Sequence, residues 1–289
     1  MFKNIAVIGL GLLGGSLCKS IKKYIPDARV SAYGRDMAKL APALNDGAVD
    51  EIGALDSISL EDRDLVVVCT PVVKSVEILR DLLQRPDLDT GAAVIDVGSV
   101  KNEIIRQTDD VARVGQFIAC HPMAGSEKAG YAYSDADLYR DAWVIITPTE
   151  KNDRAMIDRV EKFWKVLGSK IIRTDAESHD EKVAHTSHFP HITACLMVKL
   201  LSDYDSGKKV SAISPFIGSG LKDMTRIASG SPDMWRDIVS MNRGNILKAL
   251  DSFIDELETF KQRYLQSGDD LSALYDFFVT VKSIKEEMT

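Results

Sequence analysis

Residues 5–14 read IAVIGLGLLG, a short apolar run that leads into closely spaced glycines. The run is typical of a buried parallel strand, and residues 12–23 continue with helical spacing. The glycines have the G-x-G-x-x-G pattern between a strand and a helix, which is the context that a dinucleotide-binding loop requires. A side chain there would keep a pyrophosphate away from the backbone and the helix N-terminus. We predict that a dinucleotide binds through Gly9, Gly11, Leu12, Leu13 and Gly14.

The choice of dinucleotide depends on the residues after the second predicted strand, at 30–33. This strand is followed by Gly34, Arg35 and Asp36. An acid at about the distance of Asp36 from the glycine loop holds the ribose hydroxyls of NAD. Its carboxylate would repel the 2′-phosphate of NADP, whereas Arg35 would attract it. We favour NAD, and NADP is the alternative that Arg35 leaves open.

Strand-like runs continue through the first half of the chain and alternate with helical stretches. We predict strands at 65–69, 93–96, 117–120, 143–147 and 170–172, and an amphipathic helix at 153–167. This alternation predicts an α/β fold with a Rossmann-type, doubly wound parallel sheet.

From residue 178 onward we find helical periods and no convincing strand. Ser231 and Pro232 are a strong helix start, and the pattern predicts one helix from there to about residue 264 and another over 269–285. We therefore predict a dinucleotide-binding domain over residues 1–175. An all-helical domain for substrate binding and dimerisation follows over 176–289.

The bulk composition is that of an ordinary globular protein, with 45% apolar and 27% charged residues. A net charge of -7 argues against a nucleic-acid-binding surface, which needs clustered Lys and Arg. The four cysteines form no C-x-x-C pair, and most lie in apolar runs, as expected for reduced thiols in the cytoplasm. We find no signal peptide and no apolar stretch near the ~20 residues of a membrane helix.

Polar residues follow several predicted strands at the point where each strand ends. In open α/β sheets, ligands bind beyond the carboxyl ends of the strands. His121 directly follows a buried strand and precedes a small polar loop, which favours an active-site base. Ser99, one strand end away, is placed to orient its ring. The candidate residues at these ends are Thr70, Pro71, Ser99, His121, Ser126 and Glu127.

The helical half holds the other four histidines and a pair of cations. His185, His188 and His191 are spaced by three residues on a predicted helix interrupted by Pro190. Such spacing is compatible with a metal site, but no acidic or Cys partner is well placed, so we predict no metal and hydrogen-bonding groups that face a cleft. Lys222 and Arg226 are four residues apart, so we expect them on one helix face, where an anionic ligand would explain two neighbouring cations. Trp235 fits either core packing or the border of a pocket.

Over nearly its whole length the chain resembles the prephenate/arogenate dehydrogenase family of tyrosine biosynthesis. The resemblance rests on the doubled Gly14-Gly15 and on segments in the family's order: 96–101 (DVGSVK), 121–128 (HPMAGSEK), 187–191 (SHFPH), 222–228 (KDMTRIA) and 232–238 (PDMWRDI). Arg35 departs from the residue that NAD-using relatives often carry. We expect the short form of the family, without a fused mutase or a regulatory domain.

The resemblance implies an oxidative decarboxylation. Prephenate or arogenate loses CO2 and gives a hydride to NAD(P)+, forming 4-hydroxyphenylpyruvate or tyrosine. His121 matches the family's catalytic histidine, which accepts the hydroxyl proton, and Ser99 is expected to hold it and touch the substrate. Arg226 matches the residue that binds the ring carboxylate. Lys222, His188 and His191 are expected to complete the pocket, with Ser126 and Glu127 at its rim.

Two other functions remain open on the sequence alone. A β-hydroxyacid dehydrogenase also joins a Rossmann domain to a helical one, but it relies on a Lys of the helical domain. A nicotinamide-binding sensor would bind the cofactor without turnover. We also expect a homodimer formed through the amphipathic helices, as in relatives.

Overall fold

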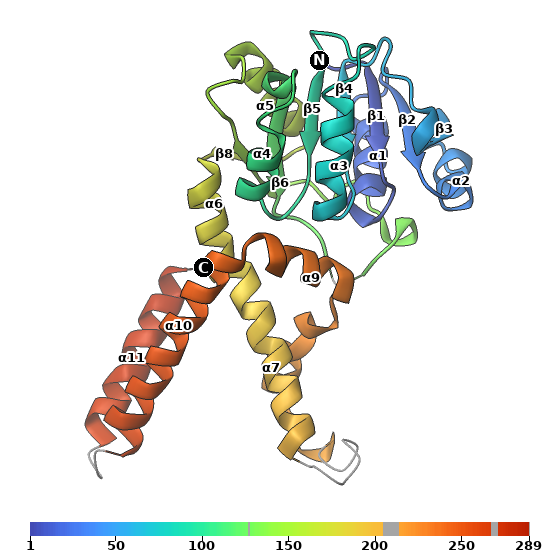
Figure 1. Ribbon diagram of the computed structural model, residues 1–289. Helices are drawn as coiled ribbons and strands as arrows, with labels where there is room; N and C mark the ends of the chain where they lie inside the picture. Colours follow the sequence, from blue (N-terminus) through green and yellow to red (C-terminus); the bar gives the residue numbers. More distant parts are fainter. Residues whose placement is uncertain (127, 205–213, 267–270, 289) are drawn as a thin grey trace. The chain divides into compact units, whose positions relative to one another are not determined.

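The computed structural model describes residues 1–126, 128–204, 214–266 and 271–288 (Figure 1). The chain forms two compact units, Met1–Arg243 and Gly244–Thr289. The first unit contains the sheet and all the residues of the candidate site that are described below. The second consists of helices.

An eight-stranded sheet forms the centre of the first unit, in the order β3-β2-β1-β4-β5-β6-β7-β8. Figure 1 shows the strands side by side with helices packed on them. In chain order the strands are β1 (Asn4–Ile8), β2 (Arg29–Gly34), β3 (Glu51–Ala54), β4 (Leu65–Val68), β5 (Ala93–Asp96), β6 (Phe117–Pro122), β7 (Trp143–Thr147) and β8 (Lys170–Arg173). The predicted doubly wound sheet is confirmed.

The sequence predicts a sheet that is parallel throughout, and this prediction is wrong for one pair of strands. β7 runs antiparallel to β6, while every other neighbouring pair is parallel. A parallel connection needs a crossover, usually a helix. Among the described residues between β6 and β7, the one helical element is the 3-10 turn Tyr131–Tyr133. The chain therefore returns along the neighbouring edge without crossing the sheet.

The edge strand β3 was not predicted from the sequence. Its residues, EIGA, form no apolar run, and three of the four are only half-buried. It pairs with β2 from Ser31 opposite Glu51 to Gly34 opposite Ala54. An edge strand is buried on one side at most, so it lacks the continuous apolar signal of the central strands.

Helices cover both faces of the sheet. The faces carry separate apolar clusters: Ile5 and Val7 of β1 belong to one, and Ala6 and Ile8 to the other, as the alternation along a strand requires. α1 (Leu12–Tyr24) and α5 (Arg154–Val166) contribute to the first cluster; α3 (Val72–Leu82) and α4 (Asn102–Thr108) contribute to the second. α2 (Met37–Asn45) packs against β2 and β3.

Beyond β8 the first unit is helical. α6 (Ala176–Val183), a π-helical turn (Ala184–His188) and α7 (Phe189–Tyr204) follow one another without a break. Pro190, which we expected to interrupt this helix, lies in the first turn of α7 instead, where the wider π turn precedes it. The same π turn leaves His185 exposed while His188 and His191 are buried, so these histidines do not share one environment. The remaining helices are α8 (Ser219–Thr225) and α9 (Pro232–Met241).

The predicted single helix from 231 to 264 is divided at Asn242. α9 ends at Met241, and α10 extends over Arg243–Phe260. Asn242 has non-helical backbone angles (φ -115°, ψ 27°) and a buried side chain. Its amide donates to the backbone oxygen of Asp180 at 2.7 Å. This buried polar contact, invisible to helical periodicity, ends the helix.

The second unit is built from α10 and α11 (Leu271–Glu287), with a π-helical turn at Lys261–Leu265. The rings of Phe260, Tyr264 and Phe277 contact one another with centroids 5.3 Å apart. α11 contains no buried residue. The predicted helical character from residue 178 to the end is confirmed for the described residues, among which no helix has the length and apolar character to cross a membrane.

Candidate active site

The glycine loop between β1 and α1 has the geometry of a dinucleotide cradle. Gly9 has φ +94°, which disfavours any side chain there. A Cβ on Gly14 would lie 2.0 Å from the carbonyl oxygen of Gly9, so only glycine allows α1 to begin this close to β1. A Cβ on Gly11 would meet nothing within 4 Å and would extend into open space. The loop therefore leaves backbone N–H groups accessible at the N-terminus of α1, as a pyrophosphate requires.

This loop borders a cleft of about 630 Å³ at the carboxyl ends of β1, β2 and β4. The cleft extends to α9, which contributes Asp233, Arg236 and Asp237. Predicted cofactor residues that line it are Gly9, Gly11, Arg35, Asp36, Thr70 and Pro71. Leu12, Leu13 and Gly14 are not among the lining residues; they form the first turn of α1 behind it. A dinucleotide fits this cradle, and the residues present would hold it by backbone contacts.

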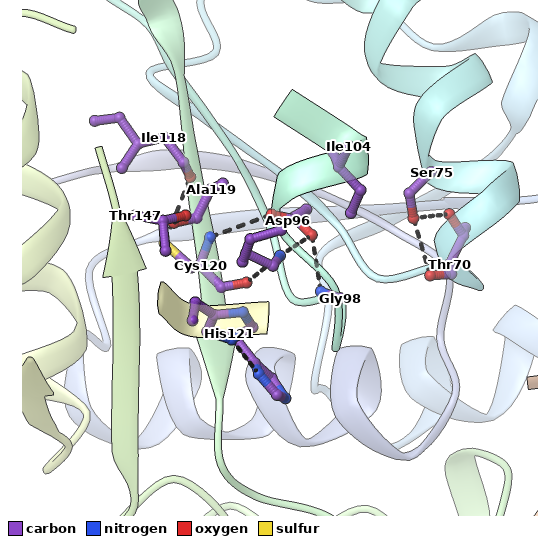
Figure 2. A network of polar contacts seen from close by, with 12 residues as sticks. Thr70, Ser75, Asp96, Gly98, Ile104, Ile118, Ala119, Cys120, His121 and Thr147 are labelled. Carbon is purple, nitrogen blue, oxygen red and sulfur yellow. Dashed lines mark hydrogen bonds and ion pairs between the residues drawn. The ribbon is translucent and has the colours of Figure 1, made fainter. Parts of the chain in front are cut away.

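His121 lies near the end of β6, on the strand next to β5. At the end of β5, Asp96 accepts hydrogen bonds from the backbone N–H of Gly98 at 2.8 Å and of Cys120 at 3.2 Å (Figure 2). The Lys101 ammonium, fully buried, forms an ion pair with Asp96 and donates to the carbonyl oxygen of Cys120 at 2.7 Å. These contacts fix the ends of β5 and β6 to each other directly before His121.

A chain of hydrogen bonds links His121 to a buried carboxylate. The Nδ1 atom of His121 lies 2.8 Å from Nε2 of His179, and Nδ1 of His179 lies 2.7 Å from Oδ1 of Asp180. A carboxylate only accepts, so with both rings uncharged His179 donates to Asp180 and His121 donates to His179. The lone pair of His121 is then on Nε2. This order leaves Nε2 of His121 able to take a proton.

The orienting partner of His121 is thus His179, and our prediction that Ser99 holds this ring nitrogen is wrong. α6 packs against α4 and brings His179 to the end of β6. Ser99 is half-buried, and within the described residues it makes no hydrogen bond to the His121 ring. Contact between Ser99 and a substrate stays a prediction.

The buried position of His121 determines its charge. Burial, followed by the neighbouring His179, Lys101 and His188, holds the pKa of His121 well below its usual value of 6.5. Since burial disfavours the charged ring, His121 is neutral near pH 7. A neutral imidazole with an open Nε2 is the form that a general base requires.

His188 and Asn242 extend this cluster on the side of the helices. The Asn242 amide lies 3.1 Å from Nδ1 of His188. His188 is 1% exposed, and its Nε2 is buried without a hydrogen-bond partner in the described structure. A buried ring nitrogen without a partner is a natural contact for a ligand or a water molecule.

His191, one turn further along α7, stacks on Trp235 with ring centroids 3.5 Å apart. Both line a second cavity of about 700 Å³, together with Arg236 and Arg243. Trp235 lines this cavity and also packs against one of the apolar clusters of the sheet, so both interpretations of its role stay open.

We expect the folded protein to lose stability in mild acid because of His188. Burial lowers the pKa of His188 from 6.5 to about 4, so the folded chain leaves this ring neutral while the unfolded chain protonates it. The unfolded state binds more protons between pH 6.5 and pH 4, and stability falls as the pH falls through this range. At about 1.4 kcal/mol per pH unit, His188 accounts for about 3 kcal/mol. This contribution is measured by urea unfolding of wild type and His188→Asn at pH 7, 5.5 and 4.5. Equal pH slopes for both proteins would contradict the assignment.

The structure separates the two predicted cations into different helical segments. α8 ends at Thr225, and Arg226 begins a 3-10 turn, so Lys222 and Arg226 do not lie on one α-helix as expected. The turn closes at Gly230, where a Cβ would lie 2.5 Å from Nε1 of Trp235. Both cations are exposed, and the 3-10 turn packs against α7. Among the rim residues, Ser126 is exposed and accepts from the N–H of Lys128 at 3.2 Å, and Glu127 lies outside the described residues.

Sequence reasoning missed His179, Asp180 and Asn242. The adjacent His-Asp pair at 179 and 180 was a usable signal, because a carboxylate beside an imidazole commonly fixes its tautomer. Nothing in the local pattern marks Asn242. Among the described residues, no group of three or more His, Cys, Asp or Glu side chains is arranged to hold a metal ion.

The fold and the site together define a dinucleotide-dependent dehydrogenase. Residues 17–173 match the family model described as "Prephenate dehydrogenase, nucleotide-binding domain", and residues 175–278 match "Prephenate dehydrogenase, dimerization domain". The chain belongs to the prephenate dehydrogenase family.

Individual relatives agree with this assignment. The chain is 34% identical to the cyclohexadienyl dehydrogenase of Zymomonas mobilis, over 94% of this chain and 92% of the relative. It is 31% identical to the prephenate dehydrogenase of Bacillus subtilis, over 99% and 76%. A crystal structure of prephenate dehydrogenase from A. aeolicus with hydroxyphenyl propionate and NAD+ superposes with a TM-score of 0.92 at 29% identity, covering 100% of this chain and 99% of the other. Synechocystis arogenate dehydrogenase gives 0.81 at 25% identity, covering 99% and 100%. These matches favour the first of our three functional readings over the β-hydroxyacid dehydrogenase and the sensor.

Proposed function

We propose that this protein catalyses the NAD+-dependent oxidative decarboxylation of prephenate or arogenate in tyrosine biosynthesis. The observation that carries the proposal is the buried, neutral His121 near the carboxyl end of β6, at the same edge of the sheet as the dinucleotide cleft. Its Nδ1–H donates to His179, which leaves Nε2 to accept a proton. Family membership supports the substrate class.

His121 acts as the base of this reaction. Its Nε2 accepts the proton of the ring hydroxyl as the C–H bond at the same carbon breaks; the nicotinamide, when bound, accepts the hydride. The imidazolium that forms keeps its Nδ1–H bond to His179, which Asp180 polarises. Loss of CO2 from the ring leaves an aromatic phenol, so the electrons of the breaking C–C bond complete the aromatic ring.

The remaining site residues hold the substrate. Arg226 binds the ring carboxylate, since a guanidinium pairs with a carboxylate through two parallel hydrogen bonds. The unpartnered Nε2 of His188 and the His191 ring on Trp235 support contacts with the polar groups of the substrate. We assign substrate contacts to Ser99, Ser126, Glu127, His188, His191, Lys222 and Arg226.

A two-by-two assay tests the proposal. Prephenate or arogenate is combined with NAD+ or NADP+, and the reduced nicotinamide is followed by absorbance. We expect turnover with at least one substrate and NAD+. Absence of activity in all four combinations, with cofactor binding intact, would reject the proposed reaction.

We further propose that the protein is a homodimer with its domain boundary at residue 175/176. The two family models, which meet between residues 173 and 175, support this boundary, and the second is described as a dimerisation domain. The four free cysteines suit a cytoplasmic location, where thiols stay reduced.

Exposed apolar side chains on α11 lead us to expect a dimer in solution. Tyr275, Phe278 and Val279 are 70%, 57% and 49% exposed, more apolar surface than a monomer usually leaves in contact with water. Analytical ultracentrifugation at micromolar concentration is expected to give the dimer mass. Phe278→Glu should shift it to monomer, and the control Ser283→Glu on the same helix should not. A stable wild-type monomer would contradict the expectation.

A further inference from the structure

Gly15, the second residue of the doubled glycine, makes a close contact away from the dinucleotide cleft. A Cβ on Gly15 would lie 2.6 Å from Cδ2 of Tyr131 and 3.0 Å from Cβ of Ser134. Both neighbours belong to the connection between β6 and β7, residues 123–142, which follows the strand of His121. Among the described residues that border the cleft, neither Gly15 nor Tyr131 is included. The glycine thus lets a segment from beyond the proposed base pack directly on α1.

The same connection is hydrogen-bonded along the length of α1. The hydroxyl of Tyr139 donates to the carbonyl oxygen of Leu13 at 2.7 Å, in the first turn of the helix. The hydroxyl of Ser16 accepts from the backbone N–H of Asp135 at 2.9 Å. Two further side chains of α1 donate to carbonyl oxygens of the connection, at 3.1 and 2.6 Å. The connection therefore has a fixed position on the helix that begins at the glycine loop.

Tyr131 joins this connection to α2 as well. The side chain is 8% exposed, and the Lys19 ammonium lies over its ring, 4.7 Å from the centroid. The Tyr131 hydroxyl donates to Oδ2 of Asp46 at 3.1 Å, and Asp46 is the C-cap of α2. Burial, followed by this hydrogen bond, raises the pKa of Tyr131, so the phenol is protonated near neutral pH and donates to the carboxylate.

Both helices that Tyr131 contacts begin at the dinucleotide cleft. Gly11 is the N-cap of α1 and Asp36 is the N-cap of α2, and both residues border the cleft. The connection that carries Tyr131 follows β6, which carries His121. This one side chain therefore links the elements that border the dinucleotide cleft to the strand of the proposed base.

We infer that Tyr131 is a positioning residue, which holds the β6–β7 connection in register with α1 and α2 so that substrate and dinucleotide meet in the correct geometry. The inference rests on the proposed function, because it places the substrate beside His121. A misplacement of about 1 Å caused far from the chemistry can cost about 100-fold in rate. Ordinary contact begins at 3.4 Å, so a Cβ on Gly15, 2.6 Å from the Tyr131 ring, would displace that ring by about this amount.

Gly15→Ala is the first test, because it displaces the Tyr131 ring without removing a polar group. In protein whose fold is checked by circular dichroism, kcat/KM for the accepted substrate should fall by about 10–100-fold. NADH affinity, followed by fluorescence, should stay within about threefold of wild type, since Gly15 lies outside the cleft. In the Tyr131→Ala background the same substitution should cost less than about twofold more, because the ring is no longer there.

The hydroxyl of Tyr131 is tested separately through its bond to Asp46. Tyr131→Phe keeps the ring and loses the bond, and kcat/KM should fall by about threefold to tenfold, as for one hydrogen bond. Asp46→Ala should give the same loss and the double variant no more, because each removes one and the same contact. Asp46→Asn keeps an acceptor and should stay within about twofold of wild type. So should the matched control Tyr133→Phe, which lies in the same 3-10 turn with its side chain 54% exposed.

Amide hydrogen exchange tests the same linkage without turnover. The N-termini of α1 and α2 border the cleft, so bound NAD+ should steady both helices and, through Tyr131, the connection. NAD+ is expected to slow exchange of residues 131–139 by at least about threefold in wild type and in Tyr133→Phe. In Tyr131→Phe the slowing should be less than about twofold.

Three results would overturn the inference. Folded Gly15→Ala and Tyr131→Phe could keep kcat/KM within about twofold of wild type. NADH affinity could fall by the same factor as kcat/KM, which would mean that the effect passes through the glycine loop itself. NAD+ could also fail to protect residues 131–139 in wild type, or protect them equally in Tyr131→Phe. A wild type that binds NAD+ but turns over neither substrate would instead reject the proposed reaction, and the exchange measurement then decides the inference alone.

Discussion

His121→Asn is expected to lower kcat by about 10²–10⁴-fold, the usual contribution of a positioned general base. In energy this is about 3–5 kcal/mol of transition-state stabilisation. Asparagine can still donate an N–H toward His179, but it has no basic nitrogen in place of Nε2. The variant thus removes the proton acceptor and retains the hydrogen bond beneath it. Steady-state kinetics with the accepted substrate measure the loss.

Two further measurements separate chemistry from folding in this variant. NADH binding, followed by fluorescence, should match wild type within about twofold, because His121 does not line the dinucleotide cleft. In wild type, kcat/KM should fall with decreasing pH only below 6.5, since the pKa of His121 is lowered; the variant should lose this dependence. A kcat within about fivefold of wild type would remove His121 from the role of base.

Gly14→Ala is expected to damage both the fold and the cofactor site. The new methyl group would lie 2.0 Å from the Gly9 carbonyl oxygen and 3.1 Å from Cβ of Cys69, so backbone must move. Overpacking of this kind costs about 1–3 kcal/mol or more, and the displaced loop should bind NADH at least about 100-fold more weakly. Urea unfolding and a fluorescence titration give the two numbers.

Gly11→Ala is expected to weaken cofactor binding without a loss of stability. A Cβ at Gly11 meets no atom within 4 Å, and its φ of -85° suits any residue, so stability should stay within about 0.5 kcal/mol of wild type. The methyl group would nevertheless occupy the space through which a pyrophosphate approaches the loop, and we expect NADH affinity to fall more than about tenfold. Equal NADH affinity in wild type and Gly11→Ala would place the pyrophosphate elsewhere.

The central sheet was predictable from sequence because buried parallel strands leave continuous apolar runs and end at recognisable glycines or polar residues. The 65–69 run, for example, corresponds to β4. The predictions that were wrong depended on how segments far apart in the sequence pack together. The direction of β7 depends on a connection that lacks a helix, and the break at Asn242 depends on a carbonyl oxygen some sixty residues away. The local periodicity of the sequence indicates neither the direction of β7 nor the break at Asn242.

The candidate site shows the same division. The position of His121 followed from its place after a strand, and the cradle followed from the spacing of the glycines. His179 was overlooked because its partner lies in the other half of the sequence, 58 residues before it. Ser99 follows the strand next to that of His121, so the sequence favoured it, but the packing of α6 brings His179 to the ring instead.

Asp180 accepts hydrogen bonds both from the candidate site and from the start of a helix of the fold. Its carboxylate accepts a hydrogen bond from Nδ1–H of His179. It also accepts hydrogen bonds from the backbone N–H groups of Lys101 and Asn102, at 2.8 and 2.9 Å, where α4 begins. A substitution of Asp180 is expected to act on the proposed base, through His179, and on the start of α4 together, because the same carboxylate contacts both His179 and that start. Any change at Asp180 made to tune the proposed base is therefore expected to alter the stability of the fold as well.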